Sequence, residues 1–255
     1  MQPITRFGWL GAAAMATALT LSGCGSSGSD PQSRTTQYGD VEGVNDSAAS
    51  GTYFWKGLPY AKPPVGALRW KAPVAPASWS STLQAKAFGA SCIQNPRLYS
   101  PGNSNTFDAS VGDNLISGNT PGSEDCLSLN IWRPATDEKN LPVIVFIHGG
   151  SNITGYSADP MYDGAALAKK ANAVVVSANY RLGQLGFFRH PALRDKTVDP
   201  TLTADDQSGN YAVLDIVQAL KFVQGNIASF GGDKNNVTVS GQSAGAINIL
   251  AVLTA

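Results

Sequence analysis

The feature that most constrains the fold of this chain is a serine, Ser243, that stands between a predicted strand and a predicted helix. Val237 and Val239 belong to a short β-branched strand, and the apolar residues after Ala244 predict a buried helix. The sequence GQSAG at residues 241–245 joins the two. A serine in such a turn takes a strained backbone conformation, and the flanking glycines let the strand and the helix approach each other. We therefore predict that the Ser243 hydroxyl projects from the carboxyl edge of a sheet, beside free helix amides, as a nucleophile. An ordinary turn serine is the alternative.

Composition excludes several classes of function. The formal net charge is zero and only 14% of the 255 residues are charged, so the sequence offers no basic surface for nucleic acid. Two histidines and three cysteines, which are not clustered, give no plausible metal site. A dinucleotide fingerprint and a Walker loop are also absent from the sequence. We predict a protein without metal or cofactor, long enough for one large α/β domain or two small ones.

The first residues predict export. Residues 1–23 contain one cation, Arg6, and an apolar run at 9–21 that is too short to span a bilayer, so we interpret them as a secretory signal. The run ends in LSGC, which resembles the bacterial lipobox, and Cys24 is therefore predicted to carry a lipid that anchors the protein to the bacterial cell envelope. The alternative is a general export signal that contains a cysteine, in a secreted or periplasmic protein. The Gly/Ser-rich residues 24–35 predict a flexible tether.

Alternating strands and helices predict the fold class. Strands are expected at residues 38–44 and 51–56, as a pair, and at 141–148 and 173–179, which are apolar throughout and so predicted to be buried on both faces of a sheet. Helices are expected at 160–172, with Met161, Ala165, Leu167 and Ala168 inward, and at 209–229, with Val213, Val217, Leu220, Val223 and Ile227 on one face. This order predicts an α/β protein with a doubly wound, mostly parallel sheet and N-terminal antiparallel strands. Its site is expected at the carboxyl ends of the strands.

A glycine pair follows the third of these strands. In the sequence HGGS at residues 148–151, Gly149 and Gly150 let the backbone turn with its amides pointing inward, as an acyl-transfer site requires for its oxyanion. A plain strand-ending turn is the alternative. We predict a scaffold role for His148, because the base of such a hydrolase follows the nucleophile along the chain. His190 lies in a polar loop and is predicted to be exposed.

Five runs of sequence share a pattern with one family. They are LPYAKPPVGALR at 58–69, EDCLSLNI at 124–131, HGGS at 148–151, NYRLGQLGF at 179–187 and the run at 230–245 that contains GQSAG. Together they resemble the type B carboxylesterases, the family that includes the cholinesterases. The resemblance covers about residue 36 to residue 255. It implies an α/β-hydrolase fold and a serine hydrolase that cleaves small-molecule carboxylic esters through an acyl-enzyme.

The resemblance also assigns the oxyanion donors. They are the backbone amides of the turn at Gly149, Gly150 and Ser151, joined by the amide of Ala244. Ser151 stands where the family has a third glycine, which need not abolish the site because the donor is the backbone. Gln242 stands where many relatives have glutamate, and this argues against cationic substrates.

Three pairs of residues are implied by resemblance alone. A disulfide is expected between Cys92 and Cys126, with free buried thiols as the alternative. Ion pairs are expected between Arg69 and Glu124 and between Arg181 and Asp215, with an ordinary solvated surface as the alternative.

The family's acid and histidine base follow the nucleophile, and no histidine follows Ser243 in this sequence. We therefore expect residues 36–255 to be the N-terminal half of a carboxylesterase domain, inactive as it stands apart from residual catalysis. The sheet is expected to be cut off beside the strand that precedes Ser243, which leaves an open edge and predicts poor solubility. The alternative function is that of an esterase-like binding or adhesion protein at the cell surface, without catalysis.

Overall fold

The computed structural model describes residues 30–94 and 122–254, so the predicted signal at 1–23 and Cys24 lie outside the described residues. Ser33–Thr36 form strand β1, which pairs with β2 (Gly39–Glu42). The sequence predicts a tether up to residue 35, and this boundary is wrong because pairing with β2 fixes the last residues of the segment. The ordered domain therefore begins before residue 36.

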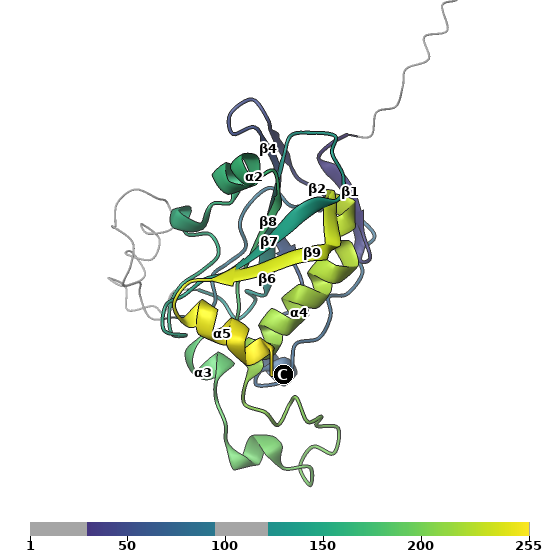
Figure 1. Cartoon of the computed structure of the whole chain (residues 1–255). Helices are drawn as coiled ribbons and strands as arrows, with labels where there is room; N and C mark the ends of the chain where they lie inside the picture. Colours follow the sequence, from purple (N-terminus) through teal and green to yellow (C-terminus); the bar gives the residue numbers. More distant parts are fainter. Residues whose placement is uncertain (1–29, 95–121, 255) are drawn as a thin grey trace, which may run out of the picture.

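A six-stranded sheet forms the centre of the described domain, in the order β3-β4-β6-β8-β7-β9 (Figure 1). Its strands are β3 (Val44–Asp46), β4 (Thr52–Pro59), β6 (Ser128–Pro134), β7 (Leu141–Ile147), β8 (Val174–Ala178) and β9 (Gly232–Gly241). A smaller sheet of β1, β2 and β5 (Leu83–Gln84) lies beside it. Of the strand predicted at 38–44, only Val44 pairs with β4, as the first residue of β3, because residues 39–42 join the smaller sheet.

The large sheet is mixed rather than mostly parallel. β7 runs parallel to both β8 and β9, whereas the pairs β3-β4, β4-β6 and β6-β8 are antiparallel. The prediction of a mostly parallel sheet is wrong for the described residues, because it counts only the strands that alternate with helices. β9 stands at the edge of the sheet and pairs, among the described residues, with β7 alone.

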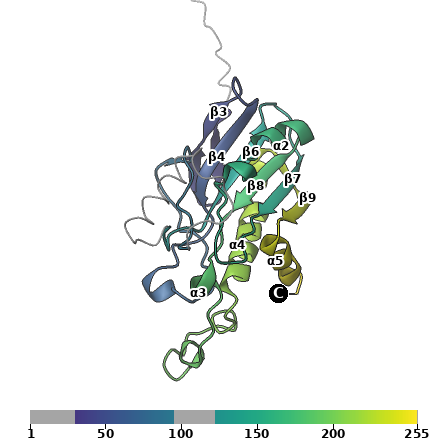
Figure 2. The same ribbon diagram turned by 90° about the vertical axis from the view of Figure 1, so that its left-hand side faces the viewer.

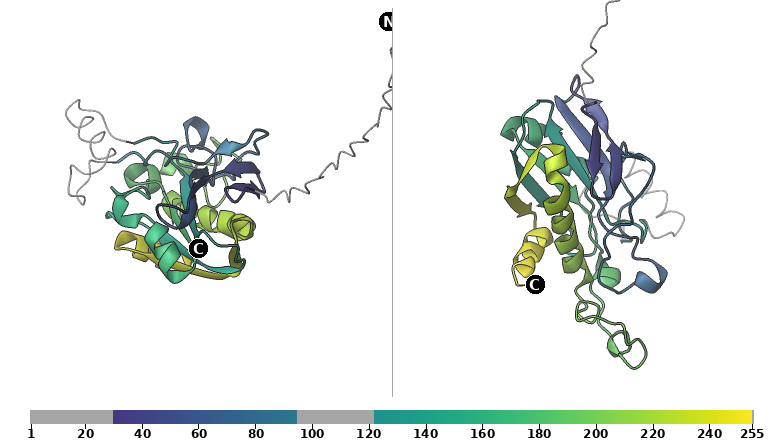
Figure 3. Two further views of the ribbon diagram at one scale, coloured as in Figure 1. Left: turned by 90° about the horizontal axis from the view of Figure 1, so that it is seen from above. Right: turned by 90° about the vertical axis from the view of Figure 1, so that its right-hand side faces the viewer.

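Helices cover both faces of the large sheet, as the doubly wound prediction requires (Figure 2). Helix α2 (Ala165–Ala171) packs over β4, β6 and β8, and Ala168 lies against Trp132 and Val175 there. Helices α4 (Tyr211–Asn226) and α5 (Ala244–Val252) pack together on the opposite face, beside β9 (Figure 3). The short helices are α3 (Gly183–Gly186) and the 3₁₀ turns η1 (Gly66–Leu68), η2 (Pro160–Tyr162), η3 (Pro191–Arg194) and η4 (Ile227–Phe230).

The segment predicted as one helix at 160–172 is divided into the 3₁₀ turn η2 and the helix α2, so a different set of its residues faces the core. The side chain of Asp159 caps η2 by accepting a hydrogen bond from the amide of Met161, and α2 begins only at Ala165. The helical period does not carry across this break. Ala168 is buried as predicted, but Met161 is 64% exposed and Leu167 46% exposed, so their inward assignment is wrong.

The helix predicted at 209–229 is α4 followed by η4, and its buried face is centred on Ala212, Ile216, Ala219 and Val223. Val223 was predicted on this face, whereas Val217 is only half-buried. The prediction of a buried helix differs more from the structure in α5 than in α4. Ile247 and Leu250, and Leu253 at its C-cap, are 67%, 64% and 77% exposed, because the helix packs on α4, β7 and β9 with its other face.

Candidate active site

The nucleophile candidate and the glycine turn are brought together by neighbouring parallel strands. β7 and β9 are paired up to their last residues, where Ile147 lies opposite Gly241. The amide of Gln242 continues the ladder by donating to the carbonyl of Ile147 over 3.2 Å. The turn after β7 and the turn after β9 therefore leave the same edge of the sheet side by side, which is where a doubly wound fold places its site.

Ser243 has the strained conformation predicted for it. Its φ of 53° and ψ of −121° lie outside the regions that residues with a side chain normally occupy. Ser243 is the N-cap of α5, and its side chain is exposed. A methyl group on Gly245 would lie 2.5 Å from the carbonyl oxygen of His148, and one on Gly241 would lie 2.7 Å from the carbonyl carbon of Gly245. Both flanking glycines are thus required by the close approach of strand and helix.

The glycine turn lies directly against this serine. A methyl group on Gly149 would lie 3.0 Å from Cβ of Ser243. Gly150 has a φ of 117° and Ser151 has a φ of 55°. The carbonyl of Gly150 closes the turn by accepting hydrogen bonds from the amides of Ile153 and Thr154, over 3.0 and 3.1 Å. Ser151 thus adopts a left-handed backbone, which a glycine adopts at lower cost.

The proposed oxyanion donors are available for a ligand. The amides of Gly150, Ser151 and Ala244 donate to no backbone carbonyl within residues 30–94 and 122–254. Ala244 begins α5, and the first amides of a helix have no partner inside it. Free amides from two turns at one strand edge can stabilise negative charge on a single oxygen.

His148 is part of the scaffold beneath this turn. Its ring is 1% exposed and stacks on Tyr180 at 4.4 Å between centroids, and its Nδ1 lies 2.9 Å from the carbonyl oxygen of Gly149. Burial lowers the pKa of His148 to about 4, against the smaller opposing effect of the Gly149 hydrogen bond. The imidazole is therefore neutral near pH 7. His190 is exposed and its Nδ1 accepts from the amide of Ala192, so neither histidine is placed as a base for Ser243.

A hydrogen-bonded pair of asparagines links the glycine turn to α5, and the sequence analysis did not predict this pair. Nδ2 of Asn248 donates to Oδ1 of Asn152 over 2.8 Å, and the reverse contact measures 3.4 Å. Asn152 follows the glycine turn, whereas Asn248 is 3% exposed on the inner face of α5. A polar residue inside an otherwise apolar helix was the available signal, because buried amides need partners.

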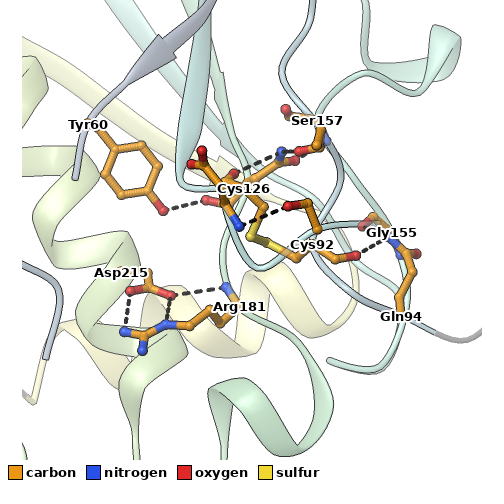
Figure 4. Close-up of a disulfide and its surroundings, with 12 residues drawn as sticks. Tyr60, Cys92, Gln94, Cys126, Gly155, Ser157, Arg181 and Asp215 are labelled. Carbon is orange, nitrogen blue, oxygen red and sulfur yellow. Dashed lines mark hydrogen bonds and ion pairs between the residues drawn. A yellow bond between two sulfur atoms is a disulfide. The ribbon is translucent and has the colours of Figure 1, made fainter. Parts of the chain in front are cut away.

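The cysteine and charged pairs implied by the resemblance are all present. Cys92 and Cys126 form a disulfide with a Cα–Cα distance of 4.9 Å. Arg181 contacts both carboxylate oxygens of Asp215, at 2.7 and 2.8 Å, in a pair that is almost fully buried. Figure 4 shows the Arg181–Asp215 pair beside the disulfide. Arg69 pairs with Glu124 in the same bidentate way, nearer the surface.

Gln94 links the disulfide to the end of the glycine turn (Figure 4). Its Oε1 accepts from the amide of Gly155 over 2.7 Å and from the hydroxyl of Thr154 over 2.8 Å, and its Nε2 donates to the carbonyl of Cys92 over 3.1 Å. The disulfide therefore supports the site through one side chain. Within the described residues, no group of three histidine, cysteine or carboxylate side chains could hold a metal ion, and no helix is long and apolar enough to cross a bilayer.

Helices on both faces of a sheet, with a strand that ends in a sharp turn before a helix, are the arrangement of the α/β-hydrolase fold. The family model of the carboxylesterase family matches residues 30–255. The chain therefore belongs to the carboxylesterase family.

Individual relatives agree with this assignment. The chain is 43% identical to para-nitrobenzyl esterase of Bacillus subtilis over 220 residues, which cover 86% of this chain and 40% of that protein. It is 40% identical to cholinesterase of Mus musculus, covering 84% of this chain and 33% of that one. A solved para-nitrobenzyl esterase structure superposes with a TM-score of 0.72 at 41% identity, covering 88% of this chain and 41% of that chain. The chain thus spans about two fifths of the length of the first relatives that it matches.

Proposed function

We propose that the protein to which these residues belong is a serine hydrolase that cleaves carboxylic esters through an acyl-enzyme. The hydroxyl of Ser243 attacks the ester carbonyl, and the developing oxyanion is held by the amides of Gly150, Ser151 and Ala244. The alcohol leaves, and water then hydrolyses the acyl-serine. The observation that carries this proposal is the position of the Gly149–Ser151 turn against Ser243, with a gap too small for a methyl group on Gly149.

We also propose that the triad acid and the histidine base belong to parts of the protein other than these 255 residues. The sequence has two histidines: the ring of His148 is buried against Tyr180 with its Nδ1 at the carbonyl of Gly149, and His190 is exposed with its Nδ1 accepting from the amide of Ala192. A serine without its base retains only the catalysis that oxyanion donors and binding provide. On this proposal residues 36–255 supply the nucleophile and the oxyanion donors, and the polypeptide alone is close to inactive.

For the substrate we propose a neutral carboxylic ester of small size. Gln242 precedes the nucleophile and carries no charge, so this position offers no carboxylate for a cationic alcohol such as choline. Names of relatives include para-nitrobenzyl esterase and acylcarnitine hydrolase. These names support ester hydrolysis, but they refer to esters of different alcohols and so do not identify the alcohol for this chain.

Export and lipid anchoring at Cys24 form a separate proposal. The disulfide between Cys92 and Cys126 supports it, because disulfides persist in oxidising compartments outside the cytosol. The test is the mass of the mature N-terminus in a bacterial host, with Cys24→Ala as the control. A lipid-modified Cys24 is expected, and an unmodified cysteine within a cleaved or uncleaved signal would contradict it.

The test of the catalytic proposal uses a fluorophosphonate probe, which reacts with activated serines. The chain of 255 residues and a chain continued by the downstream coding sequence are each labelled, with Ser243→Ala in both as the control. We expect Ser243-dependent labelling of the longer chain only. Absence of labelling from both would instead favour the esterase-like binding protein, against which the free amides beside Ser243 presently argue.

A further inference from the structure

A cavity lies far from Ser243, at the opposite end of the large sheet. It is an open cavity of about 470 Å³ between β1, the turn after β6 and η4. The cavity touches Gly231, directly before β9, whereas Ser243 follows the far end of that strand (Figure 1). The ten residues of β9 rise by roughly 3.3 Å each, which separates the two places by about 30 Å. The cavity is therefore no part of the candidate active site.

Two arginines face this cavity, and the first is buried. Arg133 is only 5% exposed. Its guanidinium donates to four main-chain carbonyls, those of Pro134, Thr136, Glu138 and Phe230, over 2.6 to 3.4 Å. It forms no salt bridge with a carboxylate in the described part of the chain. A buried positive charge held only by neutral carbonyls is a favourable partner for an anion.

The second arginine is Arg34 on β1, which is half-buried. Its guanidinium stacks over the ring of Trp55 at 5.0 Å and donates to the carbonyl of Ser33 over 2.7 Å. It too has no salt bridge to a carboxylate within the described ranges. Burial, and next the positive charge of Arg133, lower the pKa of Arg34. The two guanidiniums thus repel each other across a shared space.

The other charges of the lining leave a positive excess. Lys139 adds a third cation and Asp137 is the one carboxylate among the lining residues, while the Tyr53 phenol and the Ser229 hydroxyl are neutral groups that can donate. Asp30 also acts on Arg34, and Asp137 and Glu138 act on Arg133, but none of them lies within ion-pair distance of its arginine. Three cations face one carboxylate at the wall of the cavity.

We propose that this cavity is a binding site for a phosphate-type oxyanion, held between Arg34 and Arg133. The planar guanidinium of Arg34 can donate to two oxygens of a phosphate, whereas Arg133, which already donates four of its five N–H groups to carbonyls, adds its charge and one further donor. The ligand neutralises two charges that otherwise face each other. It is either a free phosphate or the phosphate of a lipid headgroup, since the lining begins at Pro31, within the predicted tether of residues 24–35 and seven residues after Cys24.

The first test measures thermal unfolding of the full chain in inorganic phosphate and in sodium chloride of the same ionic strength. Phosphate is expected to raise the unfolding temperature by a few degrees, as a ligand of the folded state does. Arg34→Met keeps the stacking on Trp55 and should weaken the apparent phosphate affinity by about tenfold, the value of one lost charge-assisted hydrogen bond. Arg133 is left intact, because its four carbonyl contacts also hold the turn after β6.

The matched control is Lys170→Met, which removes one exposed cation from α2. It should respond to phosphate like the unmodified chain. An unfolding temperature that is the same in phosphate and chloride, or a phosphate response that Arg34→Met leaves unchanged, would overturn the proposal.

The second test separates the two sources of phosphate. The full chain is sedimented with vesicles of phosphatidylcholine alone and of phosphatidylcholine mixed equally with phosphatidylglycerol. Arg34-dependent binding to the mixed vesicles assigns the site to a lipid headgroup. Phosphate stabilisation that depends on Arg34, without Arg34-dependent vesicle binding, assigns it to a free phosphate. Dependence on Arg34 in neither experiment refutes the site.

Discussion

Ser243 has a backbone that only glycine adopts at low cost, with φ at 53° and ψ at −121°. Such strain costs about 1–3 kcal/mol, and glycine loses roughly 0.5–1 kcal/mol to the entropy of the unfolded chain. Ser243→Gly should therefore be more stable than Ser243→Ala by about 1 kcal/mol. Both variants lack the hydroxyl, so the difference isolates Cβ. Urea unfolding at neutral pH measures it, and an alanine variant at least as stable as the glycine variant would show that the turn is unstrained.

His148 should make the fold sensitive to acid. Its pKa is about 4 in the folded protein and close to 6.5 when unfolded, because burial disfavours the imidazolium. Between these values the unfolded state binds a proton that the folded state does not, so stability is lost as the pH falls from 6.5 towards 4. From pH 7 to pH 5 the loss is about 2 kcal/mol.

The measurement is the unfolding free energy at both pH values for the unmodified chain and for His148→Asn. The asparagine variant should be less stable at neutral pH but should lose less on acidification. His190→Asn is the control and should keep the full pH dependence, since that ring is exposed. An equal pH dependence in all three proteins would mean that His148 titrates normally.

At the level of elements, the sequence predicted best where apolar residues follow one another without interruption. β7 and β8 are apolar runs flanked by turns, and both lie where the apolar pattern places them. β8 is buried throughout as predicted, but burial on both faces is wrong for β7. Pro142 is exposed and Ile144 and Phe146 are half-buried, because β7 has more residues on that face than its neighbours cover among the described residues.

β6 gives no such pattern, because all seven of its residues are buried, Asn130 and Arg133 included. The amide of Asn130 is satisfied by Ser157 and Ser177, which are distant in sequence. Partners of this kind cannot be inferred from local periodicity, and so β6 was not predicted as a strand.

The backbone positions of the candidate site could be predicted because they depend on residues that are close together in the sequence. Gly149, Gly150, Ser243 and Ala244 owe their positions to the backbone of two turns, and turn chemistry is local. The asparagine pair at 152 and 248 depends instead on how α5 packs against the glycine turn, which no local pattern specifies.

The disulfide is the element-scale contact whose removal should cost most. It closes a loop with a sequence separation of 34 residues, which corresponds to about 4 kcal/mol of stabilisation in the chain-entropy model. Cys92→Ala combined with Cys126→Ala should lower the unfolding free energy by about this amount. Cys24→Ala serves as the control for loss of a thiol. Unchanged stability of the double variant under non-reducing conditions would contradict the estimate.

At the scale of the whole molecule, the flank formed by β9 and α5 is left uncovered within the described residues. β9 offers an unpaired edge within the described residues, and α5 beside it exposes Ile247, Leu250 and Leu253. An open strand edge next to exposed apolar side chains favours association with another chain. We expect the 255-residue chain to self-associate as its concentration rises, and sedimentation velocity over a dilution series measures this.

Two variants of α5 decide whether this flank causes the association. Leu250→Lys places a charge on the exposed face and should reduce self-association while changing stability by no more than about 0.5 kcal/mol. Ile249→Lys changes the neighbouring residue, which packs against the core, and should destabilise the fold by at least about 2 kcal/mol because a charge is then buried without a partner. A chain that stays monomeric at every concentration and unfolds in one cooperative transition would show that β9 and α5 form a stable surface, since neither the open edge nor the apolar side chains would then drive association.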